Sequence, residues 1–240
     1  MTHQSGNRGM RKPAMIGAAL FAMLSAESGA QQLECPRFPE PEARLEWVAP
    51  YMMYNGVPMS VKRFDSEQKP ADILAFYRRA WSAGPAGAAA IEYTVGPWQT
   101  IAAARGNCFF TVQVQASGSK GSTGLLSATQ APDRVRVIDS DKALPMMQGS
   151  TVINDIEHHD DGKAARTLLL SNGFSAESNA DFYRRSLGDQ GWKIVSSYQM
   201  TTKKGPGITI VMKRGLEEAS LVITRSGNAT TVLANLVNRP

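Results

Sequence analysis

Two stretches of the chain, Pro70–Trp81 and Ala176–Leu187, carry apolar residues at every third or fourth position. This spacing predicts an amphipathic helix in each stretch. Both stretches contain the sequence FYRR, and the two copies lie 106 positions apart. Pro70 suits the first position of a helix, where its missing N–H needs no partner, and Ser175 can cap the second helix. We therefore expect two helices that share one sequence pattern.

Alternating apolar and polar residues predict antiparallel strands around each helix. In Cys108–Ala116, for example, phenylalanine and valine alternate with threonine and glutamine, so one face of this strand is expected to be buried. Turn glycines recur at related places. Gly56 and Gly162 lie 106 positions apart before the helices, and Gly106 and Gly215 lie 109 positions apart after them. This regularity indicates one structural unit written twice.

From this pattern we predict an α+β fold of two tandem related domains, residues 47–130 and 149–240. Each domain is expected to be an antiparallel sheet, made of a hairpin and three or more further strands, with one helix packed on one face. Residues 131–148 contain two prolines and mixed charges and are the predicted linker. Residues 31–46 contain three prolines and are expected to form an extended lead-in.

Residues 1–30 have the features of a signal peptide. A basic region ending at Lys12 precedes the apolar run Met15–Ser25, which is too short to span a bilayer. The small residues Ser28–Ala30 are typical of a cleavage site. We expect an exported protein, periplasmic in a Gram-negative bacterium or secreted, with no stable membrane insertion once this segment is removed.

Two cysteines, Cys35 in the lead-in and Cys108 in the first repeat, are the only ones in the chain. Two cysteines in an exported protein most often pair, and the alternative is two free thiols. We predict a disulfide that attaches the lead-in to the first domain. Closing a loop of this size stabilises a fold by roughly 4 kcal/mol on the chain-entropy model.

The helical FYRR sequence, the Gly191-Trp192 pair and the hairpin sheet resemble small domains of exported bacterial proteins of uncharacterised function. The Gly-Trp pair occurs only in the second repeat, because Pro85-Ala86 occupies the matching place in the first. The resemblance implies the compartment and the fold, and it implies no active site.

Each predicted helix ends with two arginines, Arg78 and Arg79 in the first repeat and Arg184 and Arg185 in the second. Cations in the last turn of a helix interact favourably with the helix dipole and remain solvated. The alternative is that each pair forms an anion-binding patch.

A cluster of His158, His159, Asp160 and Asp161 is the main candidate for metal binding. Consecutive residues of a strand point to opposite faces of a sheet, so these side chains converge only if the turn bends them together. A solvated hairpin tip is the default interpretation, and a metal site is the alternative.

Composition excludes several functions. The formal net charge of +5 comes without blocks of like charge, which argues against a nucleic-acid partner. No phosphate-binding glycine loop precedes a helix, and no catalytic signature is present, so we expect no cofactor and no enzyme activity. We predict a non-catalytic envelope protein with a binding or assembly role, which contacts an envelope protein partner through its sheet edges or the cleft between its domains. The alternative is a small-ligand or metal-binding receptor, or an enzyme, with a site between the domains.

Overall fold

The structure is a computed structural model, and it describes residues 1–2, 32–82, 89–118, 121–132, 139–160, 163–202 and 205–238. The predicted signal peptide lies almost entirely outside these ranges, as do residues 133–138 of the predicted linker. Both assignments therefore stay predictions.

Twelve strands and three helices make up the regular structure of the described residues. In chain order they are β1 (Arg44–Tyr54), β2 (Val57–Ser66), α1 (Pro70–Ser82), β3 (Ile91–Val95), β4 (Trp98–Arg105), β5 (Cys108–Ser117), β6 (Gly121–Gln130), α2 (Ser140–Ala143), β7 (Thr151–Asp160), β8 (Lys163–Asn172), α3 (Ala176–Asp189), β9 (Lys193–Thr202), β10 (Gly205–Arg214), β11 (Glu217–Ser226) and β12 (Ala229–Asn238). Strand residues far outnumber helix residues, so the protein is mostly β.

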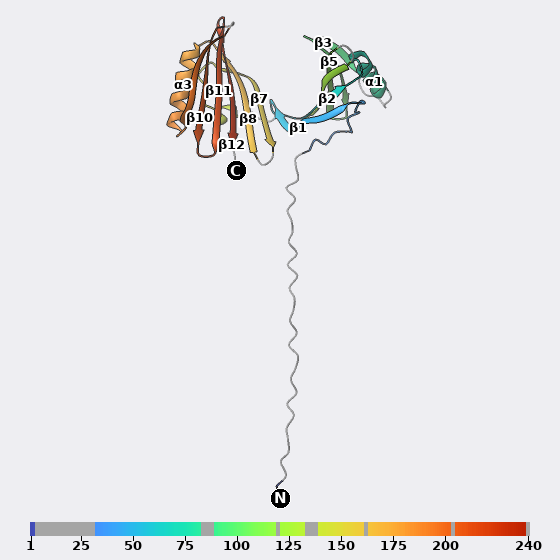
Figure 1. Ribbon diagram of the computed structural model, residues 1–240, viewed down its shortest axis with the longest axis horizontal. Helices are drawn as coiled ribbons and strands as arrows, with labels where there is room; N and C mark the ends of the chain where they lie inside the picture. Colours follow the sequence, from blue (N-terminus) through green and yellow to red (C-terminus); the bar gives the residue numbers. More distant parts are fainter. Residues whose placement is uncertain are drawn as a thin grey trace. The chain divides into compact units, whose positions relative to one another are not determined.

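All twelve strands belong to one sheet, in the order β3-β4-β5-β6-β2-β1-β7-β8-β12-β11-β10-β9 (Figure 1). Every neighbouring pair is antiparallel. We call the lead-in with β1–β6 and α1 the first half, and α2 with β7–β12 and α3 the second half. The strand order of one half mirrors that of the other. As a result β1 and β7 meet in the middle, and β3 and β9 form the two open edges.

The predicted α+β fold of two tandem domains is therefore wrong. Strand β1 pairs with β7 through Met52↔His158, Met53↔Glu157 and Tyr54↔Ile156, and these contacts join the strands of both repeats into a single sheet. By their contacts, residues 31–240 form a single unit. Alternating residues predict that a segment is a strand, but they do not say which distant strand lies beside it.

The two longer helices lie against the sheet along their apolar sides. Helix α1 contacts β4 and β5, and helix α3 contacts β9, β10 and β11 (Figure 1). Tyr77 and Tyr183, the tyrosines of the two FYRR sequences, are fully buried in separate hydrophobic clusters. Ser175 caps α3 as predicted, because its side chain accepts a hydrogen bond of 2.9 Å from the backbone N–H of Ser178.

The predicted disulfide between Cys35 and Cys108 is confirmed. It fixes the lead-in, residues 32–43, against the face of the sheet that carries α1. Phe38 of the lead-in packs edge-on against Phe110 of β5, with ring centroids 4.8 Å apart. The hydroxyl of Tyr77 donates a hydrogen bond of 2.9 Å to the backbone carbonyl of Pro39. The lead-in is thus part of the core of the first half.

Candidate interaction edges

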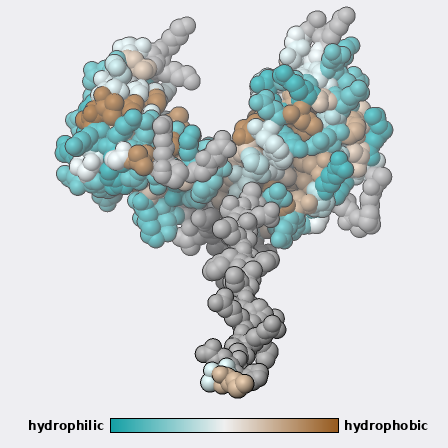
Figure 2. Space-filling view, turned by 60° about the horizontal axis from the view of Figure 1, so that its bottom comes forward, coloured by the Kyte–Doolittle hydropathy of each residue, from teal (hydrophilic) through white to brown (hydrophobic). Residues whose placement is uncertain are grey.

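The open edges of the sheet, β3 and β9, expose several large apolar side chains. Each strand pairs on one side only, β3 with β4 and β9 with β10. The exposed apolar residues are Ile91, Tyr93 and Val95 on β3, and Ile194, Val195, Tyr198 and Met200 on β9. Tyr198 is the most exposed of them, at 65%. Hydrophobic residues are visible at the surface in Figure 2, among the hydrophilic ones.

Most of strand β9, after Lys193, lacks the charged side chains and proline that often protect an edge. Sheets are commonly shielded at their edges by charged side chains or proline, which hinder pairing with another chain. The nine residues Ile194–Thr202 contain neither. In β3 the acidic residue Glu92 interrupts the apolar run, and the strand is only five residues long. Strand β9 is therefore the better candidate for pairing with a partner strand.

The first arginine of each FYRR sequence connects its helix to the nearby edge strand. Arg78 donates two hydrogen bonds to the carboxylate of Glu92 on β3, of 2.6 and 2.7 Å. These bonds lower the pKa of Glu92 below its usual value. Arg184 forms an ion pair of 2.9 Å with Asp181 and donates a bond of 3.0 Å to the hydroxyl of Ser197 on β9.

The second arginines, Arg79 and Arg185, are exposed at the surface. Arg79 lines a shallow hollow together with the acidic residues Glu42 and Asp72, whose charges oppose an anion there. The predicted anion-binding role of the four arginines stays a prediction, and among the described residues the side chains of Arg79 and Arg185 have no hydrogen bond or ion pair.

The two histidines of the candidate metal cluster point to opposite faces of β7, as residues adjacent in a strand do. His158 pairs with Met52 across the junction of β1 and β7. His159 lines a hollow on the opposite face, beside Arg166 and Trp192. Asp160 is the last residue of β7, and Asp161 lies outside the described residues. Within the described ranges, no group of three or more histidine, cysteine or acidic side chains is placed to hold a metal ion.

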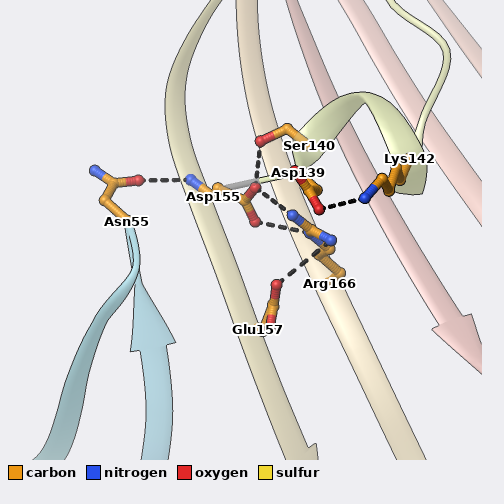
Figure 3. Close-up of polar contacts among 7 residues, drawn as sticks. All are labelled: Asn55, Asp139, Ser140, Lys142, Asp155, Glu157 and Arg166. Atoms are coloured by element: carbon orange, nitrogen blue, oxygen red, sulfur yellow. Dashed lines mark hydrogen bonds and ion pairs between the residues drawn. The ribbon is translucent and has the colours of Figure 1, made fainter. Parts of the chain in front are cut away.

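A buried polar network, which the sequence analysis missed, lies at the junction of the two halves (Figure 3). Asp155 of β7 is only 3% exposed. Its carboxylate accepts hydrogen bonds of 2.9 and 2.7 Å from Arg166 of β8 and one from the hydroxyl of Ser140. Arg166 also lies 3.4 Å from Glu157. The bonds to Asp155 are the main reason that the pKa of Arg166 is raised.

The same network reaches across to the first half through the turn between β1 and β2. Asn55 has a positive φ of 49° and precedes Gly56 with a φ of 77°, as a tight hairpin turn requires. The side-chain oxygen of Asn55 accepts a hydrogen bond of 2.7 Å from the backbone N–H of Asp155. The backbone N–H of Asn55 donates a hydrogen bond of 2.8 Å to the backbone carbonyl of Asp155. Arg166 and Ser140 bind the carboxylate of Asp155, and Asn55 binds its backbone. The network therefore joins the two halves, and Asp155 is not a free acid or base.

A sequence signal for part of this network was available. Glu157 and Arg166 lie symmetrically about the predicted turn at residues 161–162, so a hairpin places them directly opposite each other. For β9, the signal was the uncharged run Ile194–Thr202 after the Gly191-Trp192 pair. That the strand lies at an edge followed only from the topology.

Comparisons of the chain with protein-family models, with curated proteins and with solved structures found no match. Within the described residues, none of the helices has the length and apolar character needed to cross a membrane.

Proposed function

We propose that the protein is a non-catalytic exported binding protein, which receives an extended segment of an envelope protein partner along strand β9. One observation carries this proposal. Strand β9 is an open edge of ten residues with exposed apolar side chains and no charge from Ile194 to Thr202. A partner strand gains main-chain hydrogen bonds at such an edge, and alternate side chains provide specificity.

Two further observations support this role. The disulfide between Cys35 and Cys108 is typical of an oxidising compartment, which fits export to the periplasm or secretion. Among the described residues, the buried carboxylate of Asp155 is engaged by Arg166, and His158 and His159 lie on opposite faces of β7.

The test compares partner binding by two variants, one with a new positive charge on strand β9 and one with the same charge in a turn away from that strand. Tyr198→Lys puts a cation in the middle of β9. Leu216→Lys removes an equally exposed apolar side chain, also 65% exposed, from the turn between β10 and β11. Partners crosslinked in the cell envelope should be lost with Tyr198→Lys and retained with Leu216→Lys. Retention of all partners by the Tyr198→Lys protein, at normal levels and fold, would refute the proposal.

Amide hydrogen exchange distinguishes strand addition from other contacts. Pairing along β9 would engage the outward N–H groups of Ile194–Thr202 and slow their exchange in the complex. Slowed exchange confined to other strands would place the contact elsewhere and contradict the proposal.

A further inference from the structure

A hollow of about 290 Å³ lies between the lead-in and the face of the sheet that carries α1. The lead-in forms its roof, and β1, β2, β5 and β6 form its walls and floor. Its lining residues are Leu33, Cys35, Pro36, Arg37, Phe38, Glu40, Trp47, Ser60, Lys62, Phe110, Leu126 and Ala128. The hollow belongs to the first half alone and is separate from the edge strand β9.

Several independent contacts hold the roof in place. The disulfide fixes one end of the lead-in, and the hydrogen bond from Tyr77 to Pro39 fixes its middle. At the other end the hydroxyl of Ser66 donates a bond of 2.9 Å to the carbonyl of Glu42. Because the lead-in is tied at three places, the hollow is formed in advance, and a ligand would not have to order this segment on binding.

The floor and the mouth of the hollow differ in chemistry. Phe110 and Leu126 on the floor are buried core residues, and Phe38 covers them from the lead-in. At the mouth, the ammonium group of Lys62 forms an ion pair with Glu40. It also lies 4.2 Å from the ring centroid of Trp47, a residue that is 53% exposed.

Arg37, also at the mouth, is exposed and has no recorded ion pair within the described part of the chain. Two cations therefore face one anion there. An apolar floor below a cationic mouth suits an amphipathic anion.

The second half has a hollow in the corresponding place, which argues that the feature belongs to the repeated unit. Ser60 and Arg166 are the fourth residues of β2 and β8, and Ala128 and Leu236 are the eighth residues of β6 and β12. In each pair, the first residue lines the hollow of the first half and the second residue lines the hollow of the second half. The hollow of the second half measures about 600 Å³.

More charged side chains line the second hollow than the first. Arg166 and Arg214 project into it, and each is engaged by acidic side chains of the same half. Of these two hollows, only the one below the lead-in combines an apolar floor with a cation, Arg37, that forms no ion pair within the described residues.

We propose that the hollow of the first half binds a small amphipathic carboxylate. Its apolar chain would lie against the partly exposed side chains of Leu33 and Phe38, above the buried residues Phe110 and Leu126. Its carboxylate would contact Lys62 and Arg37. An apolar cavity of about 150 Å³ admits a benzene molecule, so a volume about twice as large suits a ligand of roughly ten non-hydrogen atoms. Octanoate has this size and charge. The inference does not depend on strand addition at β9.

The direct test is titration of the purified, oxidised chain with octanoate by calorimetry, with octan-1-ol and octylammonium as comparison ligands. We expect one octanoate per chain, bound more tightly than the alcohol, and weaker binding or none for the ammonium compound. Fluorescence of Trp47 should change on binding, and this change should be absent from a Trp47→Phe protein that still binds. Equal binding of octanoate and octylammonium, or no saturable binding of octanoate at millimolar concentrations, would overturn the proposal.

Charge variants at the mouth test the position of the carboxylate. Lys62→Met should weaken octanoate binding about tenfold, the loss expected for one charge-assisted hydrogen bond, and leave octan-1-ol binding unchanged. Lys213→Met, which removes an ion pair with Glu218 in the second half, is the matched control and should change nothing. Glu40→Gln should strengthen octanoate binding, because it frees Lys62 from its internal partner.

A variant that fills the hollow tests its location. Ala128→Leu introduces the side chain that the second half carries at the matching position, Leu236, and should abolish binding of both octanoate and octan-1-ol. The reverse change, Leu236→Ala, should leave binding intact. If Ala128→Leu does not fold, the Lys62→Met and Lys213→Met pair decides alone. Equal loss of octanoate affinity in these two proteins would place the ligand elsewhere.

Discussion

The tyrosines of the two FYRR sequences allow one substitution to be tested at matching positions with opposite expected effects. Tyr77 and Tyr183 are both fully buried, each on the side of its helix that faces the sheet. The hydroxyl of Tyr77 donates a hydrogen bond of 2.9 Å to the carbonyl of Pro39. The hydroxyl of Tyr183 has no hydrogen-bond partner among the described residues.

Replacement of each tyrosine by phenylalanine removes only the hydroxyl. Tyr77→Phe loses a buried hydrogen bond and leaves the carbonyl of Pro39 unpaired, so it should lower the free energy of unfolding by about 1–2 kcal/mol. Tyr183→Phe removes an unpaired buried hydroxyl, whose burial costs about 1–3 kcal/mol in proteins, so it should raise the free energy of unfolding by a similar amount. In a chain of this size, 1 kcal/mol corresponds to a change in Tm of about 2–4 °C.

The assay is urea unfolding of the oxidised protein, followed by circular dichroism and fluorescence, with thermal unfolding as a second measure. The midpoints of the two variants should move in opposite directions from that of the parent protein, with unchanged slopes. If Tyr183→Phe destabilises the protein as much as Tyr77→Phe does, the hydroxyl of Tyr183 has a partner in solution and the reasoning fails.

Three further predictions concern the core and the junction. Asp155→Ala removes a buried carboxylate that binds the partly buried guanidinium of Arg166 and the hydroxyl of Ser140, and it should cost about 1.5–3 kcal/mol in urea unfolding. Asp65→Ala, which breaks exposed ion pairs, should cost less than about 1 kcal/mol, and equal costs would contradict the assigned burial. Gly124→Ala should destabilise the first half strongly and lower the Tm, because an added Cβ would lie 2.2 Å from the carbonyl oxygen of Gln113. An unchanged Tm would show that β5 and β6 do not approach each other so closely. Burial raises the pKa of both tyrosines above the usual tyrosine value, so the unfolded chain loses these protons first as the pH rises. The free energy of unfolding should therefore fall above about pH 10, with a shallower slope in the double Tyr→Phe protein, and identical slopes would refute this.

Local pattern in the sequence determined much of the secondary structure. The helical spacing of apolar residues predicted α1 and α3, and alternation with turn glycines predicted strands such as β5 and hairpins such as that at Asn55-Gly56. The disulfide was predictable for a simple reason, since Cys35 has one possible partner in the chain. These features depend on contacts between neighbours in sequence or on a choice among very few residues.

The arrangement of the sheet was decided by tertiary structure. Pairing between β1 and β7 involves three residue pairs whose members lie about one hundred positions apart, and nothing in the alternation of either strand distinguishes an edge from an interior position. The exposure of β9, the engagement of Asp155 by Arg166 and the hollow below the lead-in all follow from that arrangement. A period of two residues fixes which face of a strand is buried. Which strand becomes its neighbour depends on the free edges and volumes that the rest of the folded chain leaves available.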